Sequence, residues 1–272
     1  SSADQTTYIQ AAINYAGTAH KPVRIPAGSF NIKGLYISTP NIKLIGQPGA
    51  VLKYTAVEAN PPTGIYAAIV IGAVGAGTAN VAADKGNYTV LENIRIDMDA
   101  SSSNGIHIRN SSYVLINNCT VTGSKVQGFV VTDGKYNRII NNIAINCETA
   151  FSLADWLDNP TGITNQASYN IISNNIAHST TAAGYGAVEF NASGQSQQDY
   201  NSLTNNIVAW PDATKAVSTT GTNSITGLNV KGDLINVYTG STLSTTKTLS
   251  ARTEGWENYT ISNGVITNIA TA

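Results

Sequence analysis

Three carboxylic acids lie at the end of, or within, short apolar segments of the chain and could carry acid–base chemistry. Asp133 and Asp155 close the segments GFVVTD and AFSLAD, and Glu189 lies within AVEFNA. If these segments are equivalent strands on adjacent coils, the backbones of Asp133 and Asp155 lie about 4.8 Å apart. A carboxyl pair about 5–5.5 Å apart is the arrangement of retaining glycosidases, because repulsion between like charges keeps one group protonated. Glu189, on the next coil, would be a reserve acid across a wider gap that leaves room for water.

A turn at the strand end is a second interpretation of these acids. Asn110 closes the equivalent segment GIHIRN, and Asp133 directly precedes Gly134. Asparagine, aspartate and glycine all favour turns that follow strands. The sequence leaves both interpretations open.

Two insertions near the acids predict a wall beside them. WLDNPTGITNQAS follows Asp155, and SGQSQQD comes shortly after Glu189. Trp156, Asp158 and Tyr185 lie in or near these enlarged coils. An aromatic ring can stack on a sugar ring, although Trp156 could equally anchor its own loop. We therefore expect these three residues to contact a substrate.

Other charged residues of the strands fall into two groups. His107 shares the predicted outward column of Glu189, and with Arg109 it could bind an acidic sugar or act as a base. On another strand, outward charged residues alternate with apolar ones, and an acid follows two coils later. These residues are Arg95, Asp97, Asp99 and Glu148. The second pattern is typical of an exposed polar face.

Composition excludes several classes of partner. The chain has 272 residues, of which 42% are hydrophobic and 11% are charged, and its formal net charge is -1. It can therefore build one large core, but it lacks the basic face that nucleic acid or anionic lipid requires. No segment approaches the about 18 apolar residues of a membrane span, so we expect no membrane insertion. Metal-ligand spacings and phosphate-binding glycine loops are absent, so we expect no metal and no cofactor.

Five asparagine-containing segments repeat along the chain. They are VLENIRIDMD, LINNCTVTGS, IINNIAINCE, ISNNIAHSTT and LTNNIVAWPD, and their last paired asparagines are Asn93, Asn118, Asn142, Asn175 and Asn206. Units of about 24 residues with strands and turns cannot bury an apolar face alone, so they must stack into a β-solenoid. The asparagines would then form a buried ladder, with Asn142 hydrogen-bonded to Asn118 and Asn175.

The same alignment makes a prediction about the two cysteines. It places Cys119 in the column of Ile143 and Cys147 in the column of Met98. Both would point inward, but four strand residues would separate them by about 13 Å along the strand direction, too far for a disulfide. We expect free, buried thiols.

The N-terminal segment predicts a helix that covers an open end of the solenoid. In ADQTTYIQAAINYAG, Asp4 is a candidate N-cap, and Ile9, Ala12, Ile13 and Ala16 share one face. The strand segments VRIPAGSFNIKGLYI and NIKLIGQPGAVLKY follow. A solenoid exposes unpaired edges at its first coil, and a helix can cover them.

Together, the Asp-x-x-x-x-Ile-Gln-x-Ala-Ile helix, the Val-x-Ile-Pro-x-Gly-x-Phe strand and the Leu-x-Gly-x-x-Gly-x-x-Leu turn resemble the start of the pectate-lyase-like β-helix superfamily. Phage tailspikes and exopolysaccharide depolymerases share this opening. The resemblance implies an all-β, single-stranded right-handed parallel β-helix with an N-terminal capping helix. It also implies a polysaccharide partner and a location outside the cell or on a virion surface. No segment resembles the calcium-binding and arginine signature of true pectate lyases, which argues against pectate as the substrate.

The repeat pattern predicts two regions. Residues 1–221 would form the β-helix with its cap, and residues 222–272 a separate β-rich segment. Alternating stretches such as NYTISNGVITNI need a partner sheet, which two other protomers could supply. We therefore predict a homotrimer.

These features together predict that the chain binds and cleaves an extracellular or cell-surface polysaccharide, by hydrolysis or by β-elimination. Members of the superfamily also include epimerases and catalytically silent spikes, so fold alone does not decide the chemistry. The alternative is a carbohydrate-binding or structural β-helix without catalysis.

Overall fold

Short strands alternate with corner residues in the left-handed backbone conformation, and this alternation winds the chain into coils. The computed structural model describes residues 3–55, 66–72, 85–98, 103–154, 167–180, 186–192, 200–210, 217–221, 229–231, 233–239, 242–249, 257–262 and 265–271, the last strands by their backbone alone. Each regular coil contributes one strand to each of three sheets.

The three sheets are stacks in which each strand pairs in parallel with its equivalent one coil later, except for β24 at the end of the second sheet. The first sheet contains β1 (Val23–Ile25), β4 (Lys43–Gly46), β7 (Val90–Glu92), β10 (Leu115–Asn117), β13 (Arg138–Ile140), β16 (Ile171–Ser173), β19 (Ser202–Thr204) and β22 (Asn229–Lys231). The second contains β2 (Gly28–Ile32), β5 (Ala50–Tyr54), β8 (Arg95–Met98), β11 (Thr120–Thr122), β14 (Ile143–Ile145), β17 (Ile176–His178), β20 (Ile207–Trp210), β23 (Asp233–Thr239) and β24 (Thr242–Leu249). The third contains β3 (Leu35–Ile37), β6 (Ala67–Gly72), β9 (Asn104–Arg109), β12 (Gln127–Thr132), β15 (Thr149–Ala154), β18 (Gly186–Ala192) and β21 (Val217–Gly221).

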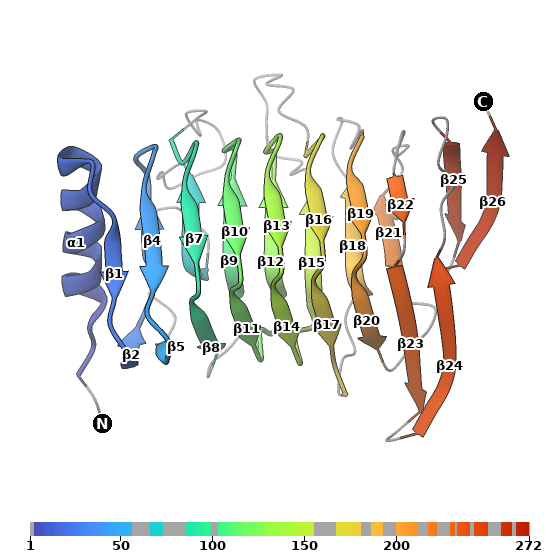
Figure 1. Cartoon of the computed structure of the whole chain (residues 1–272), viewed down its shortest axis with the longest axis horizontal. Coiled ribbons are helices and arrows are strands. Elements are labelled where there is room, and N and C mark those ends of the chain that lie inside the picture. The colour runs from blue at the N-terminus through green and yellow to red at the C-terminus, as the bar shows by residue number, and fades with distance from the viewer. Residues whose placement is uncertain are drawn as a thin grey trace.

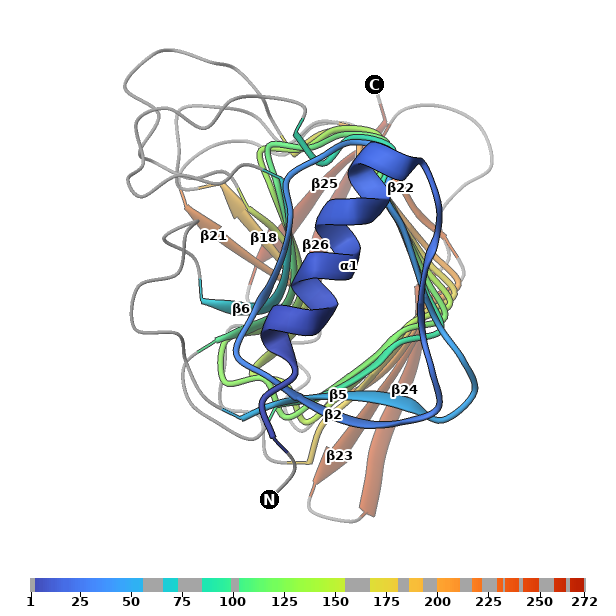
Figure 2. The ribbon, with the colours of Figure 1, turned by 90° about the vertical axis from the view of Figure 1, so that its left-hand side faces the viewer.

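The result is a right-handed parallel β-helix, as the sequence predicted. Figure 1 shows the coils side by side along the long axis of the molecule, with the N-terminal helix at one end and the C-terminal strands at the other. Figure 2 looks along this axis and shows the sheets enclosing one interior, with the helix lying across its end.

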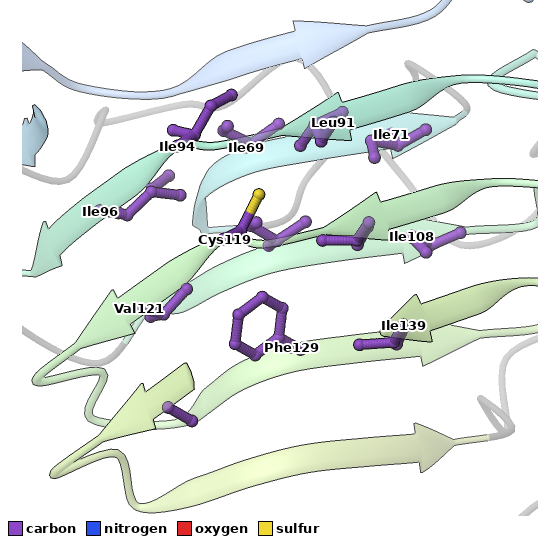
Figure 3. Close-up of a cluster of buried hydrophobic side chains, with 14 of the residues drawn as sticks. Ile69, Ile71, Leu91, Ile94, Ile96, Ile108, Cys119, Val121, Phe129 and Ile139 are labelled. Carbon is purple, nitrogen blue, oxygen red and sulfur yellow. The ribbon is translucent and has the colours of Figure 1, made fainter. Parts of the chain in front are cut away.

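Inward side chains fill this interior in columns. Ile96, Val121, Ala144, Ala177 and Val208 occupy equivalent positions on five coils of the second sheet, and all are buried. Side chains from the other two sheets face the same interior, as Figure 3 shows for Leu91 and Ile139 of the first sheet and Phe129 of the third. Since a single coil cannot bury its own apolar face, each coil depends on its neighbours for stability.

Helix α1 (Thr6–Ala19) covers the first coil. Ile13 and Ala16 are buried in the core. The side-chain amide of Gln10 donates to the Tyr36 carbonyl and accepts from the Tyr36 amide, both at 2.8 Å. Gln10 therefore satisfies backbone groups at the edge of β3, where no preceding strand exists to pair with them.

The predicted capping helix is thus present, with two differences in detail. The helix begins at Thr6, and the Asp4 carboxylate accepts from the Thr6 amide at 2.9 Å without being the residue next to the helix. Ala12 is exposed, because the buried stripe runs through Ile13 and Ala16.

The predicted asparagine register is wrong by one residue between the second and third coils. The sheet pairs Leu115 with Arg138, so Asn118 is equivalent to Asn141, and Cys119 is equivalent to Asn142. The left-handed corner residues that follow these strands form one exposed column of five: Asn93, Asn118, Asn141, Asn174 and Asn205, with φ from 52° to 58°.

Asn142, Asn175 and Asn206 form a buried ladder one residue further along. Asn142 Oδ1 accepts from the Cys119 amide at 2.8 Å, and its Nδ2 donates to the Ile116 carbonyl at 3.0 Å and to Asn175 Oδ1 at 3.2 Å. The expected bond from Asn142 to Asn118 is therefore replaced by bonds to the preceding backbone. A second buried ladder consists of Asn137, Asn170 and Asn201, which directly precede β13, β16 and β19 of the first sheet. Both ladders satisfy corner backbone groups that face the interior.

Cys119 and Cys147 are free and buried, which confirms the prediction. Their predicted columns are wrong, for the same reason as the asparagines. Cys119 aligns with Asn142, and because Asp97 aligns with Ile145, Cys147 lies one position beyond the column of Met98.

The parallel sheets continue past residue 221. β22 pairs with β19 and β23 with β20, after which β24 pairs antiparallel with β23. β25 (Glu257–Ser262) and β26 (Val265–Thr271) form a separate antiparallel pair. The division of the chain at residue 221 stays a prediction. Within the described residues, no helix has both the length and the apolar character needed to cross a membrane.

Candidate functional site

The outward face of the third sheet is buried, unlike the outward faces of the other two. His107, Val130, Ser152 and Glu189 align as direct neighbours on β9, β12, β15 and β18. This register agrees with the shared column predicted for His107 and Glu189. The exposed fractions of these two side chains are 0% and 1%, whereas Arg138 and Ile171 on the first sheet are exposed. Polar side chains therefore lie together in a place that little water reaches.

The sequence places this face beside the segments that vary most in length. Residues 56–65 and 73–84 flank β6, 99–102 precede β9, 155–166 follow β15, and 181–185 and 193–199 flank β18. The first and second sheets are joined by short corners in the same coils. Variable segments on a regular scaffold are where binding residues most often lie.

His107 is held as a neutral hydrogen-bond donor. The Gln127 amide donates to Asn104 Oδ1 at 3.2 Å, which turns Asn104 Nδ2 towards His107 Nδ1 at 3.4 Å. His107 Nδ1 therefore accepts, and Nε2 carries the proton and donates to Thr132 Oγ1 at 2.9 Å. Burial, with a smaller contribution from the positive charge of Arg109, lowers the pKa of His107 to about 3. His107 thus orients its neighbours, and neither nitrogen is placed to act as the base that the sequence suggested.

Glu189 lies at the other end of a hydrogen-bond network that also contains His107. Its Oε2 accepts from Ser152 Oγ at 3.2 Å and from Gln127 Nε2 at 3.5 Å, and Gln127 also donates to Ser152 Oγ at 3.3 Å. Since Gln127 bonds to Asn104 through its backbone, one connected network runs from Thr132 to Glu189 over β9, β12, β15 and β18. It fixes the position of a carboxyl group on a rigid sheet.

Asp133 lies at a turn after this sheet. Its φ is 56°, and Asn110, at the equivalent position one coil earlier, has φ 45°. Asparagine and aspartate are the non-glycine residues that adopt this conformation most readily. The conformation favours the turn interpretation of Asp133. Arg109 is almost fully buried in β9 and aligns with Thr132.

Several predicted site residues lie outside the described residues. They are Asp99, Asp155, Trp156, Asp158 and Tyr185. The separation of Asp133 and Asp155 therefore stays a prediction. Arg95 and Asp97 pair on the second sheet at 2.7 Å with both side chains partly exposed, as expected for a polar face.

Neither thiol is suited to nucleophilic chemistry. Burial raises the pKa of Cys119 to about 12 and that of Cys147 to about 11, so both stay protonated. Among the residues that the structure describes, His, Cys, Asp and Glu side chains form no group of three that could hold a metal ion.

Sequence reasoning did not identify the residues that connect the network. Asn104 and Gln127 share the position three residues before the His107 column, and Ser152 lies in that column. Their alignment was present in the strand register, but neutral polar side chains on an outward face give no distinct signal until the face is known to be buried.

Comparisons with known proteins agree with this architecture. A family model described as a right handed beta helix region matches residues 75–242. A search of curated proteins finds no match.

Solved structures of PfbA, a surface adhesin of Streptococcus pneumoniae, are similar in fold. The first has a TM-score of 0.69 and 15% identity and covers 93% of this chain and 62% of the adhesin chain. The second has a TM-score of 0.52 and 12% identity and covers 89% of this chain and 84% of the adhesin chain. A double mutant of the tailspike of Escherichia coli bacteriophage HK620 has a TM-score of 0.47 and 14% identity and covers 86% of this chain and 58% of the tailspike chain. This chain therefore spans less than two thirds of the first PfbA structure, and such identities show the fold alone.

Proposed function

Since the chain belongs to the family of right-handed β-helix proteins, we propose that it binds a polysaccharide outside the cell or on a virion surface and cleaves it beside the third sheet. The observation that supports this proposal is the connected network that positions the Glu189 carboxyl group on four consecutive strands. A rigid sheet with a fixed acid is the kind of support that a glycan-cleaving site requires. The homotrimer predicted from residues 222–272 is part of the same proposal.

In this proposal Glu189, whose side chain is 1% exposed, exchanges a proton with a glycan that displaces what covers the third sheet, and Asp155 or Asp133 is the second carboxyl group. Proton transfer from a positioned acid or base typically accelerates such a step by about 10²–10⁴-fold. Ser152 and Gln127 hold Glu189 in place. Trp156, Asp158, Tyr185 and Arg109 are the proposed contacts to sugar rings, and His107 positions Thr132 within the floor of the site.

A second candidate function is glycan binding without cleavage. The left-handed turn conformation of Asp133 favours it, because the turn accounts for one of the three proposed acids without catalysis. The description of PfbA as a surface adhesin is consistent with this candidate.

Single substitutions of the acids test the catalytic proposal. Glu189→Gln, and whichever of Asp155→Asn and Asp133→Asn removes the second carboxyl group, should retain the fold and glycan binding while lowering the cleavage rate at least about a hundredfold, because a neutral amide cannot exchange the proton. Initial rates on a polysaccharide that the parent degrades measure this effect. Asp97→Asn, on the outward face of the second sheet, is the matched control and should keep the parent rate. Full activity in all three variants would place the site elsewhere.

A further inference from the structure

Five tyrosines stack along the corner where the chain turns from the third sheet into the first. They each lie two residues before a strand of the first sheet, and they are Tyr88, Tyr113, Tyr136, Tyr169 and Tyr200. Successive ring centroids are 5.0–5.2 Å apart, and the ring planes are within 7–18° of parallel. The first and last rings are therefore about 20 Å apart along the stack. Each tyrosine is 41–54% exposed, so this tyrosine row is a feature of the surface.

The backbone at this corner does not require tyrosine. All five tyrosines have φ between 57° and 60°, a conformation that asparagine or glycine adopts with less strain. Asn41, with φ 63°, holds the equivalent place in the coil before Tyr88. At the next corner, all five coils carry asparagine in the same conformation. The tyrosines are therefore retained for their side chains, against a local preference for asparagine.

Ring stacking alone does not account for the hydroxyl groups. Phe129 and Phe151 stack in the core with centroids 5.1 Å apart and need no hydroxyl. In the row, neighbours cover both faces of the three inner rings, so these rings present their edges to the surface. Ring edges carry partial positive charge, and a phenol can donate and accept a hydrogen bond. The row thus offers a straight line of polar, aromatic groups with one regular spacing.

Charged residues near the row are few and of both signs. Among the described residues of the corners that contain the tyrosines, the charged side chains are those of Lys85, Lys135 and Asp133. On the first sheet, Lys43 and Glu92 pair with each other at 3.2 Å. This mixture favours an uncharged ligand over a polyanion or an anionic lipid surface.

We propose that the tyrosine row is a binding site for an uncharged, hydroxyl-rich polysaccharide that lies along the axis of the β-helix. A straight line of repeated groups can be matched over its length only by a ligand that is itself extended and repeated. The row also adjoins the candidate site, because Asp133 precedes Tyr136 by three residues. The inference rests on the proposed function for its ligand class, but not on cleavage at Glu189.

Glycan-array binding tests the row directly. Tyr113→Asn and Tyr136→Asn together remove two adjacent inner rings, and they insert the residue that Asn41 shows to fit this corner. Binding to the uncharged polysaccharides that the parent recognises should fall at least about tenfold, since each lost contact to a hydroxyl group weakens binding severalfold. Tyr113→Phe with Tyr136→Phe keeps the stack. If this variant binds the same polysaccharides at least about threefold more weakly than the parent, part of the affinity comes from the hydroxyl groups.

The matched control removes two exposed tyrosines from α1, as Tyr8→Ala with Tyr15→Ala, and should bind like the parent. The cleavage rates of the parent and of Glu189→Gln are measured separately, so failure of the catalytic proposal is distinguished from failure of this inference. The inference is wrong if the double asparagine variant, folded by circular dichroism, binds as well as the parent. It is also wrong if the parent binds only charged polysaccharides or vesicles containing phosphatidylserine.

Discussion

Lowering the pH from about 7.5 to about 4.5 is expected to reduce the free energy of unfolding by about 3 kcal/mol through His107 alone. Burial holds the pKa of His107 at about 3 in the folded chain, far below the ordinary value of 6.5. A histidine with a lowered folded-state pKa binds its proton mainly in the unfolded chain. Its contribution to stability is therefore complete above pH 6.5 and is lost as the pH falls towards 3.

Chemical denaturation at several pH values measures this effect in the parent and in His107→Gln. The variant removes the titrating group, so its stability should fall by about 3 kcal/mol less over the same range. His178→Gln, which replaces an exposed histidine of β17, should follow the parent. If the free energy of unfolding changed with pH by the same amount in all three proteins, the buried, neutral state of His107 would be contradicted. Proton resonances of the His107 ring that do not titrate between about pH 5 and pH 8 would support it in the unaltered chain.

Asn142→Leu is expected to lower the free energy of unfolding by about 2–6 kcal/mol. Asn142 is fully buried, and its amide group bonds to the Cys119 amide, the Ile116 carbonyl and Asn175. Leucine fills similar space but leaves two backbone groups without partners, and each costs about 1–3 kcal/mol. Equilibrium denaturation measures the loss.

The matched control for this prediction is Asn118→Gly. Asn118 lies in the exposed column at the left-handed corner, where glycine meets no steric penalty. Its replacement should change stability by less than about 1 kcal/mol. An unfolding midpoint for Asn142→Leu that equals the parent's would mean that the buried ladder does not support the fold.

The sequence predicted the coils of the third sheet correctly and those of the first with an error of one residue. Segments such as GIHIRN and GFVVTD alternate regularly, so His107 and Val130 could be aligned without ambiguity. The asparagine pairs gave a misleading alignment, because Asn117 and Asn118 look like Asn141 and Asn142 but lie one position earlier on the coil. Asparagine suits both a left-handed corner and a buried amide ladder, and residue type alone does not separate these two environments.

Two features of the surface were not predicted, for different physical reasons. Strand alternation fixed the direction of Glu189, but it does not report whether other parts of the molecule cover that face, and the face proved to be buried. The tyrosine row, in contrast, can be recognised from the spacing of residues in the sequence. A tyrosine precedes the corner asparagine by five residues in all five coils, as Tyr136 precedes Asn141.

The most direct test of the proposed function is reducing-end release by the parent chain from a panel of capsular and plant polysaccharides. We predict the release of new reducing ends from at least one of them, at a rate that Glu189→Gln lowers at least about a hundredfold. Accompanying ultraviolet absorbance would indicate β-elimination, and its absence hydrolysis. Binding to a polysaccharide of the panel without release of reducing ends from any of them would contradict the proposed cleavage and leave glycan binding as the function.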